Sequence, residues 1–209
     1  MDLGLGNLAE LKARLLPASY TQTGFDTVIA QIGRGVASMF DGYCNRSFGR
    51  VAGEKDYFTG DRFTWIVNRF PLEVVTTLEV RDSLDAGWVV QSGLIINQQE
   101  SAGLIQFGAA LGNHYSQVRL TYTGGYWYDT TEDNTGTLPT GATQLPNDIK
   151  EAWFLACENV WLLRDKLGAK LVGGGSGASN LLGLSLPGLD FPPLVKAILD
   201  GYMRYQITG

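Results

Sequence analysis

The chain has 209 residues, of which 44% are hydrophobic and 18% are charged, and its formal net charge is -5. A chain this apolar is long enough to bury a core, and its composition is not that of a disordered protein. No run approaches the roughly 18 consecutive apolar residues that span a membrane. The first residues lack the basic region and cleavage site of a secretory signal, so we expect a protein made in the cytoplasm, without a membrane partner.

Two helices are predicted at the start of the chain. Asn7 can cap a short helix over residues 8–15. A second helix is predicted over residues 26–42. Its apolar stripe consists of Val28, Ile29, Ile32, Val36, Met39 and Phe40. Gly33 and Gly35 weaken this helix by about 1 kcal/mol each relative to alanine, so we expect them to permit the close approach of another helix.

From residue 54 to residue 128 the hydrophobic pattern has a period of two, which is typical of strands with one covered face. Gly60 and Asp61 separate the first two apolar segments and therefore predict a hairpin. The predicted strands are 55–59, 63–67, 73–81, 88–96, 104–107 and 117–122. Such short strands predict a compact antiparallel sheet, a sandwich or a small barrel.

The remainder of the chain is mostly helical. A polar connector over residues 123–146 leads to the strongest predicted helix, over residues 148–167. This helix is apolar on most sides and so needs more than one neighbour. Residues 168–190 are rich in glycine but also contain leucines, so we expect this segment to become ordered against another surface. A last helix begins at Pro192-Pro193, because proline is tolerated in a first turn.

These elements predict an α+β fold. Two N-terminal helices, one long helix and one C-terminal helix form a helical bundle, which an antiparallel β-rich insertion interrupts. The predicted parts are residues 1–53, residues 54–128 and residues 129–209, and the two helical parts form one unit.

The sequence contains little material for catalysis. Its one histidine, His114, lies in a predicted turn, and Cys44 and Cys157 are far apart and fit two buried thiols. Phosphate-binding loops, dinucleotide fingerprints and nucleophile elbows are missing from the sequence. We therefore expect no enzyme, and no catalytic residue, cofactor or metal.

Clusters of acidic residues leave two chemical alternatives open. Asp56 and Asp61 could form the acid pair of a glycoside hydrolase. A second cluster could bind calcium, although it matches no calcium-loop template. Its members are Asp129, Glu132, Asp133 and Asn134. Residues 54–133 contain 11 acidic and 5 basic side chains, which argues against a surface that grips nucleic acid.

Several stretches, in this order, resemble the head–tail connector (adaptor) proteins of long-tailed bacteriophages. LAELKARL is followed by a helix that ends in a Cys-x-Arg-x-Phe stretch at residues 44–48. FPLEVVTTLEVRD then leads into the β-rich part, and VRLTYTGGYW precedes LPNDIKEAWFLACENVWLLRD at the head of the long helix. The resemblance covers roughly residues 7–166, and the longer glycine-rich stretch after it departs from the family's pattern.

The resemblance implies structural work in a virion. Members of this family form a ring, commonly of twelve subunits, under the portal protein of the filled capsid. The ring extends the DNA channel, through which DNA passes without sequence-specific binding, and presents a surface for a head-completion or tail-side neck protein. The expected location is the virion neck, after assembly in the host cytoplasm.

Periodicity and the resemblance together predict three sets of site residues. The predicted portal-side contact consists of Phe191, Leu194, Ile198, Tyr202 and Tyr205. Packing between subunits is predicted for Trp153, Phe154 and Trp161. An acidic stripe facing the channel lumen is predicted at Asp148, Glu151, Glu158 and Asp165.

One alternative function uses the β-rich part instead. In that case the protein is a carbohydrate- or protein-binding module, with Trp65, Trp88 and Trp127 as its aromatic platform.

Overall fold

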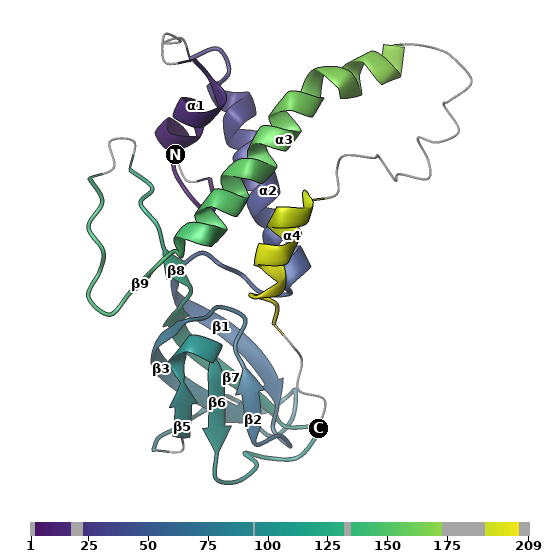
Figure 1. The fold of residues 1–209 in the computed structure, drawn as a ribbon. Helices are drawn as coiled ribbons and strands as arrows, with labels where there is room; N and C mark the ends of the chain where they lie inside the picture. The colour runs from purple at the N-terminus through teal and green to yellow at the C-terminus, as the bar shows by residue number, and fades with distance from the viewer. Residues whose placement is uncertain (1–2, 18–22, 94, 132–134, 173–190, 205–209) are drawn as a thin grey trace. The chain divides into compact units, whose positions relative to one another are not determined.

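The computed structural model describes residues 3–17, 23–93, 95–131, 135–172 and 191–204. The fold is α+β, as predicted, and the chain divides into two compact units (Figure 1). The helical unit contains residues 1–44, 129–137 and 145–203, and the β unit contains residues 45–128, 138–144 and 204–209. Each unit is described below by itself.

The described residues of the helical unit form four helices, and the longest of them contacts the other three. They are α1 (Leu8–Leu15), α2 (Asp26–Cys44), α3 (Asn147–Val172) and α4 (Pro193–Asp200). The Asn7 side chain accepts a hydrogen bond from the backbone N–H of Glu10 at 2.9 Å, which is the predicted cap of α1. The sequence therefore located all four helices, although α2 and α3 extend further than predicted.

The core of the helical unit is organised around Trp153 of α3, whose side chain is fully buried. Its indole Nε1 donates a hydrogen bond to the carbonyl oxygen of Gly33 at 3.0 Å. A Cβ atom at Gly33 would lie 3.1 Å from the Trp153 ring and 3.2 Å from Leu11. Gly33 thus permits close packing, as predicted, because a larger residue would meet the indole. At Gly35 a Cβ would meet nothing within 4 Å, so among the described residues no helix approaches Gly35 as closely as predicted.

The β unit consists mainly of two antiparallel sheets. The larger sheet has the order β1-β7-β3-β4, formed by Val51–Thr59, Gln117–Gly124, Leu72–Arg81 and Val89–Gln91. The smaller sheet has the order β2-β6-β5, formed by Thr64–Ile66, Leu104–Phe107 and Ile95–Gln99. A short 3-10 helix, η1 (Glu100–Ala102), follows β5, and β8 (Tyr126–Trp127) pairs in parallel with β9 (Thr143–Gln144).

Both sheets contribute to one hydrophobic core, so the β unit is a small sandwich. Its buried members include Trp65 of β2, Ile105 of β6, Leu78 of β3 and Leu120 of β7. The alternation of buried and partly buried residues along β7 matches the predicted period of two. With two sheets and their own core, the β-rich part is larger than an insertion into a helical bundle implies.

The predicted hairpin at Gly60 is wrong. β1 pairs with β7, and β2 pairs with β6, so Gly60 connects two different sheets. The N–H of Gly60 donates to the carbonyl of Ser116 at 2.9 Å, and the N–H of Gly112 donates to the carbonyl of Gly60 at 3.0 Å. The turn is therefore held by a loop distant in sequence rather than by a hairpin partner.

Two boundaries also differ from the prediction. The single strand expected over residues 88–96 is divided into β4 and β5, which belong to different sheets. Gly93, with φ of +72°, lies at the bend between them. Residues 45–53 belong to the β unit, where Gly49 forms a bridge with Tyr126.

Candidate functional site

Helix α4 has one face packed on the helical unit and one face open. Val195 and Leu199 are fully buried, and Phe191 just before the helix contacts Phe40 edge-to-face, with 5.1 Å between ring centroids. On the other side Leu194 is 61% exposed. The two buried residues each follow a residue of the predicted portal-side set by one position. Leu194, which belongs to that set, therefore points away from the helical unit.

Two hydrogen bonds at the C-terminal end of the α4 segment hold it in place. The Tyr43 hydroxyl donates to Asp200 at 2.7 Å, and this bond raises the pKa of Tyr43. The Tyr202 hydroxyl contacts the Asp148 carboxylate at 2.9 Å. Of the predicted portal-side residues, Phe191, Ile198 and Tyr202 are half-buried, and Tyr205 lies outside the described residues.

The three residues predicted for packing between subunits are buried within their own chain. Trp153 is 0% exposed, Phe154 is 8% exposed and Trp161 is 7% exposed. Trp161 meets Phe25 edge-to-face at 5.5 Å, and Phe154 lies under the Arg14 guanidinium at 5.9 Å. Packing inside one chain accounts for these rings, and they offer little surface to a neighbour.

The predicted acidic stripe on α3 is partly neutralised. Arg14 of α1 forms ion pairs with both Glu151 and Glu158, and these contacts raise the pKa of the Arg14 guanidinium. Asp148 accepts the Tyr202 hydroxyl, and the side chain of Asp165 lies outside the described residues. One guanidinium facing two carboxylates leaves Glu151 and Glu158 with a net negative charge.

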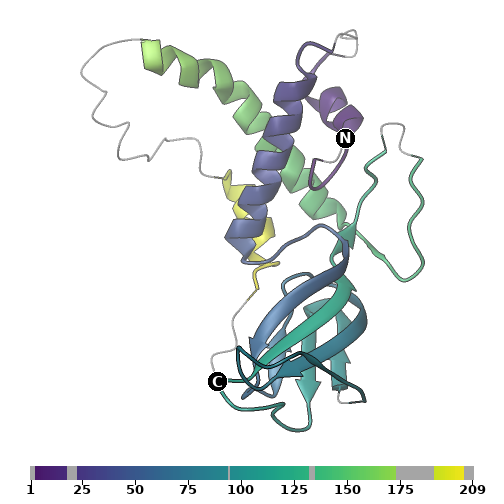
Figure 2. The same ribbon diagram turned by 180° about the vertical axis from the view of Figure 1, so that it is seen from behind.

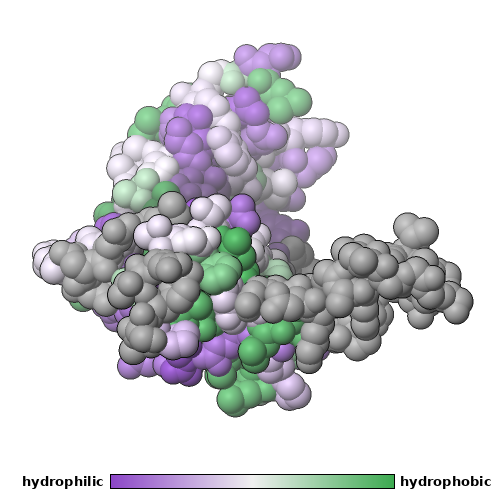
Figure 3. Space-filling view, turned by 90° about the horizontal axis from the view of Figure 1, so that it is seen from above, coloured by the Kyte–Doolittle hydropathy of each residue, from purple (hydrophilic) through white to green (hydrophobic). Residues whose placement is uncertain are grey.

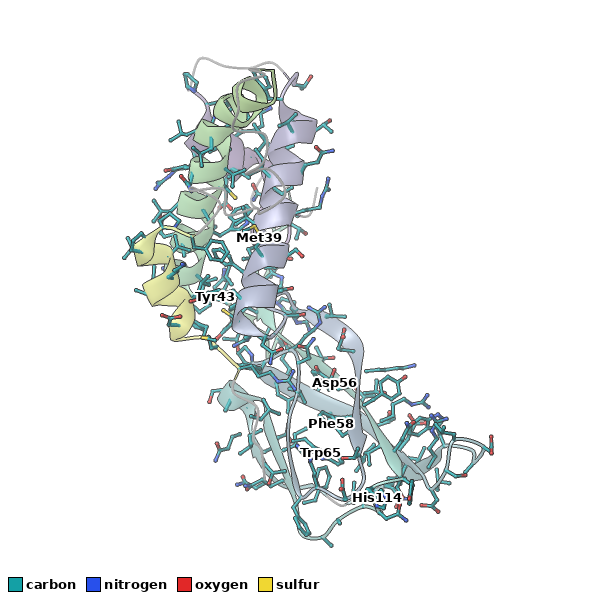
Figure 4. All side chains as sticks on the ribbon, turned by 90° about the vertical axis from the view of Figure 1, so that its right-hand side faces the viewer. Met39, Tyr43, Asp56, Phe58, Trp65 and His114 are labelled. Carbon is teal, nitrogen blue, oxygen red and sulfur yellow. The ribbon has the colours of Figure 1, made fainter. Side chains whose placement is uncertain are left out.

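The three tryptophans of the alternative platform are not gathered on one surface. Trp65 is 3% exposed and stacks on Phe58 between the two sheets, with 4.7 Å between centroids (Figure 4). Trp88 lies on the outer side of the larger sheet, where the guanidinium groups of Arg81 and Arg119 approach it at 4.6 and 4.4 Å. The larger sheet thus separates two of the three rings, while Trp127 is half-buried in β8.

The acidic groups singled out in the β-rich part also have local partners. Asp56 accepts hydrogen bonds from the Asn68 N–H at 2.6 Å and the Tyr122 hydroxyl at 2.9 Å. A hydrogen bond from Thr59 lowers the pKa of Asp61, whereas a general acid needs a raised pKa. The pair therefore has the chemistry of structural contacts rather than of a hydrolase.

The suggested calcium cluster closes a loop instead. The Asp129 carboxylate accepts hydrogen bonds from Thr131 and from the Gly136 N–H, which lower its pKa. The other three members of the cluster, at positions 132–134, lie outside the described residues. Among the residues that are described, no three His, Cys, Asp or Glu side chains gather to hold a metal ion.

An open groove of about 520 Å³ runs along the free part of β3. It is lined by residues of β3, β4 and β5, with Val74 and Val90 more than half exposed. Among the described residues of its lining there is no aromatic ring, and the charged groups are Glu73 and Glu100; Glu73 is held by Arg50 at 2.7 Å. A sugar site would need a stacking ring, so the groove does not complete the predicted platform.

The motifs that carry the family resemblance meet around one buried cation in the β unit. Arg46 is 2% exposed, and its guanidinium donates to the carbonyl of Phe70. The rings of Phe70, Phe48 and Tyr126 surround it at 3.3, 4.7 and 5.4 Å. Residues from three separate motifs thus contact one another, and their packing around one guanidinium gives them a shared structural role.

No protein-family model and no curated protein matches the chain. Within the described part, no helix is long and apolar enough to cross a membrane. Solved structures with a similar fold do exist. A chain of the virion of a native gene transfer agent (GTA) particle has a TM-score of 0.59 at 16% identity, covering 97% of this chain and 91% of that chain.

Two structures of GTA necks also contain a chain with a similar fold. A chain from the neck of an empty GTA particle, computed with C6 symmetry, has a TM-score of 0.58 at 16% identity, covering 97% of this chain and 91% of that chain. A chain from the neck of a native GTA particle, computed with C12 symmetry, has a TM-score of 0.54 at 15% identity, covering 97% and 90%. The protein therefore has the fold of a chain found in the neck of GTA particles.

Proposed function

We propose that this chain is a structural, non-enzymatic neck protein of a phage-like virion, which forms a ring under the portal. The ring would extend the DNA channel and present a platform for the next neck or tail component. The observation that carries the proposal is a fold shared along 97% of the chain with neck chains from particles of C6 and C12 symmetry. Closed rings of identical subunits are built from repeated contacts of one kind.

The open side of α4 supports a docking role for the end of the chain. Leu194 exposes 61% of its surface on a helix that Tyr43 and Tyr202 hold in place. Hydrophobic residues also reach the surface among hydrophilic ones in the view from above (Figure 3). An exposed apolar side chain on an anchored helix suits contact with another protein, here the portal. The acidic balance of the chain suits a channel that must not hold DNA.

The proposal is tested by mixing the full chain with portal rings encoded by the same genome and imaging the mixture by negative-stain electron microscopy. We expect an added ring on one end of the portal. Leu194→Asp should abolish its attachment, since it places a charge on the open face of α4. Leu84→Asp is the matched control, because Leu84 is 70% exposed in the β unit. If no complex forms at any protein concentration, the proposal is overturned.

A further inference from the structure

Helix α2 carries a second apolar line, separate from the one that it buries. Its members recur at alternating steps of four and three residues, which is the spacing of a seam between packed helices. They are Val28, Ile32, Gly35, Met39 and Gly42. Val28 is 40% exposed and Met39 is 39% exposed. We call these five residues the outer seam of α2.

Nothing in the described part of the chain accounts for the two glycines of the outer seam. Gly33, on the buried side, is required by the Trp153 ring, but Cβ atoms at Gly35 and Gly42 would meet nothing within 4 Å. Glycine inside a helix is less favourable than alanine. A glycine that faces open space on a helix becomes useful when another backbone approaches closely.

Helix α3 carries a matching line on its outward face. Glu151, Leu155, Glu158 and Leu162 follow the same alternating steps, and Leu162 is 70% exposed. We call these four residues the outer seam of α3. Arg14 pairs with both glutamates, so the surroundings of the two leucines keep a net negative charge.

The two seams face in different directions. α3 lies in front of α2 in Figure 1, and α2 lies in front of α3 in the view from behind (Figure 2). Each helix packs its buried face against the other, so the outer seams lie on opposite sides of the helical unit. Two different surfaces on opposite sides allow a head-to-tail contact that repeats from copy to copy.

We propose that the outer seam of α2 in one copy packs against the outer seam of α3 in the next copy. This inference rests on the proposed ring and names the contact that builds it. Charge disfavours the pairing of two like seams of α3, because the outer seam of α3 carries two glutamates, whereas none of the five residues in the outer seam of α2 is charged. If α3 packed against α3 of the next copy, Glu151 and Glu158 would face the same two glutamates of that copy, and the like charges would repel each other.

The pairing also changes the roles predicted for α3. The buried Trp153, Phe154 and Trp161 support the helical unit from inside, and the exposed Leu162 takes over the contact with a neighbour. Glu151 and Glu158 then line the contact between copies instead of the channel lumen.

Cysteine cross-linking in the full chain tests the contact. Gly35→Cys and Leu162→Cys are made separately, and both are oxidised alone and as a mixture, with and without portal rings. The native Cys44 and Cys157 are buried, and the unsubstituted chain controls for them. We expect a disulfide-linked dimer only in the mixture, and a ladder of multimers from the double variant, since a disulfide needs Cα atoms within about 7 Å.

If either single variant alone forms disulfide-linked dimers in the same yield as the mixture, the head-to-tail contact is overturned. No product from the mixture, while the unsubstituted chain forms rings on the portal, would also overturn it and leave the proposed function standing. A ladder without any portal complex would support the contact and overturn the portal-docking role.

A bulky residue in the seam provides a second test. Gly35→Phe should abolish ring formation on the portal, while the free subunit keeps its circular dichroism spectrum, because the space at Gly35 is open. Gly87→Phe in the β unit is the matched control, since a Cβ there also meets nothing within 4 Å. Rings of normal appearance with Gly35→Phe would contradict the proposed contact.

Discussion

The helical unit and the β unit are built around different kinds of buried side chain. In the helical unit the largest is Trp153, an apolar ring that fills the space left by Gly33. In the β unit Arg46 is a buried cation enclosed by three aromatic rings. The core of the helical unit therefore depends mainly on shape, and the core of the β unit depends also on the placement of a charge. Substitutions that change one property and keep the other should affect the two units differently.

The largest effect is expected for Trp153→Ala. Removing a fully buried indole leaves a cavity and removes its hydrogen bond to the Gly33 carbonyl, so the free energy of unfolding should fall by about 3–5 kcal/mol. Urea unfolding followed by circular dichroism measures this loss. Leu162→Ala, on the exposed face of the same helix, should stay within about 0.5 kcal/mol of the unsubstituted chain. Equal losses would show that the indole is not the centre of the core.

Arg46→Lys tests the β unit by keeping the charge and removing the planar guanidinium. An ammonium group cannot stack on Phe70 and donate to its carbonyl with the same geometry, so we expect a loss of about 2 kcal/mol in urea unfolding. Arg34→Lys, at an exposed position of α2, is the control and should change little. A fully stable Arg46→Lys protein would mean that charge alone is sufficient at this site.

Two glycines of α2 should respond to alanine with opposite signs. Gly33→Ala places a methyl group 3.1 Å from the Trp153 ring, and overpacking should outweigh the better helix propensity, with a net loss of about 1 kcal/mol. Gly35→Ala meets no neighbour, and should stabilise the free subunit by about 0.5–1 kcal/mol. Thermal unfolding of both variants under one set of conditions compares them. A loss of stability with Gly35→Ala would contradict the open surface described here.

The contrast between these glycines also shows where sequence information ends. The limits of α1 follow from local signals, such as the Asn7 side chain that caps it. Whether Gly33 or Gly35 faces the core depends on where the Trp153 side chain packs, and Trp153 belongs to a helix that is distant in sequence. The same ambiguity affected α4, where Leu194 and Val195 are both apolar and only the second is buried.

The prediction of a hairpin at Gly60 was wrong for a related reason. Gly60 has the local composition of a hairpin turn, but its N–H bonds to Ser116, and β1 pairs with β7. Such a pairing is decided by the shared core of two sheets, which no local pattern specifies. The three aromatic residues around Arg46 belong to motifs that are visible in the sequence. That their rings surround one guanidinium follows only from the fold, which brings residues 46–48, 70 and 126 together.

The smallest effect concerns an ion pair on the outer side of the larger sheet. Arg119 donates two hydrogen bonds of 2.7 Å to Glu79, and this contact lowers the pKa of Glu79. A lowered pKa contributes stability above the ordinary glutamate pKa of about 4.3, and the contribution is lost as pH falls through the folded-state value. The stability difference between the unsubstituted chain and Glu79→Gln should therefore be largest near neutral pH and shrink below about pH 4.3.

Urea unfolding of both proteins over a pH series provides the measurement. Raising the salt concentration at neutral pH should reduce the same difference, because the pair is partly exposed and its attraction is screened. A difference that stays constant from neutral to acidic pH would mean that Glu79 acts through packing alone. In that case the charge of this ion pair would contribute nothing, and stabilisation of the β unit by charge would have to come from other sites, such as the buried Arg46 and the Arg50–Glu73 pair.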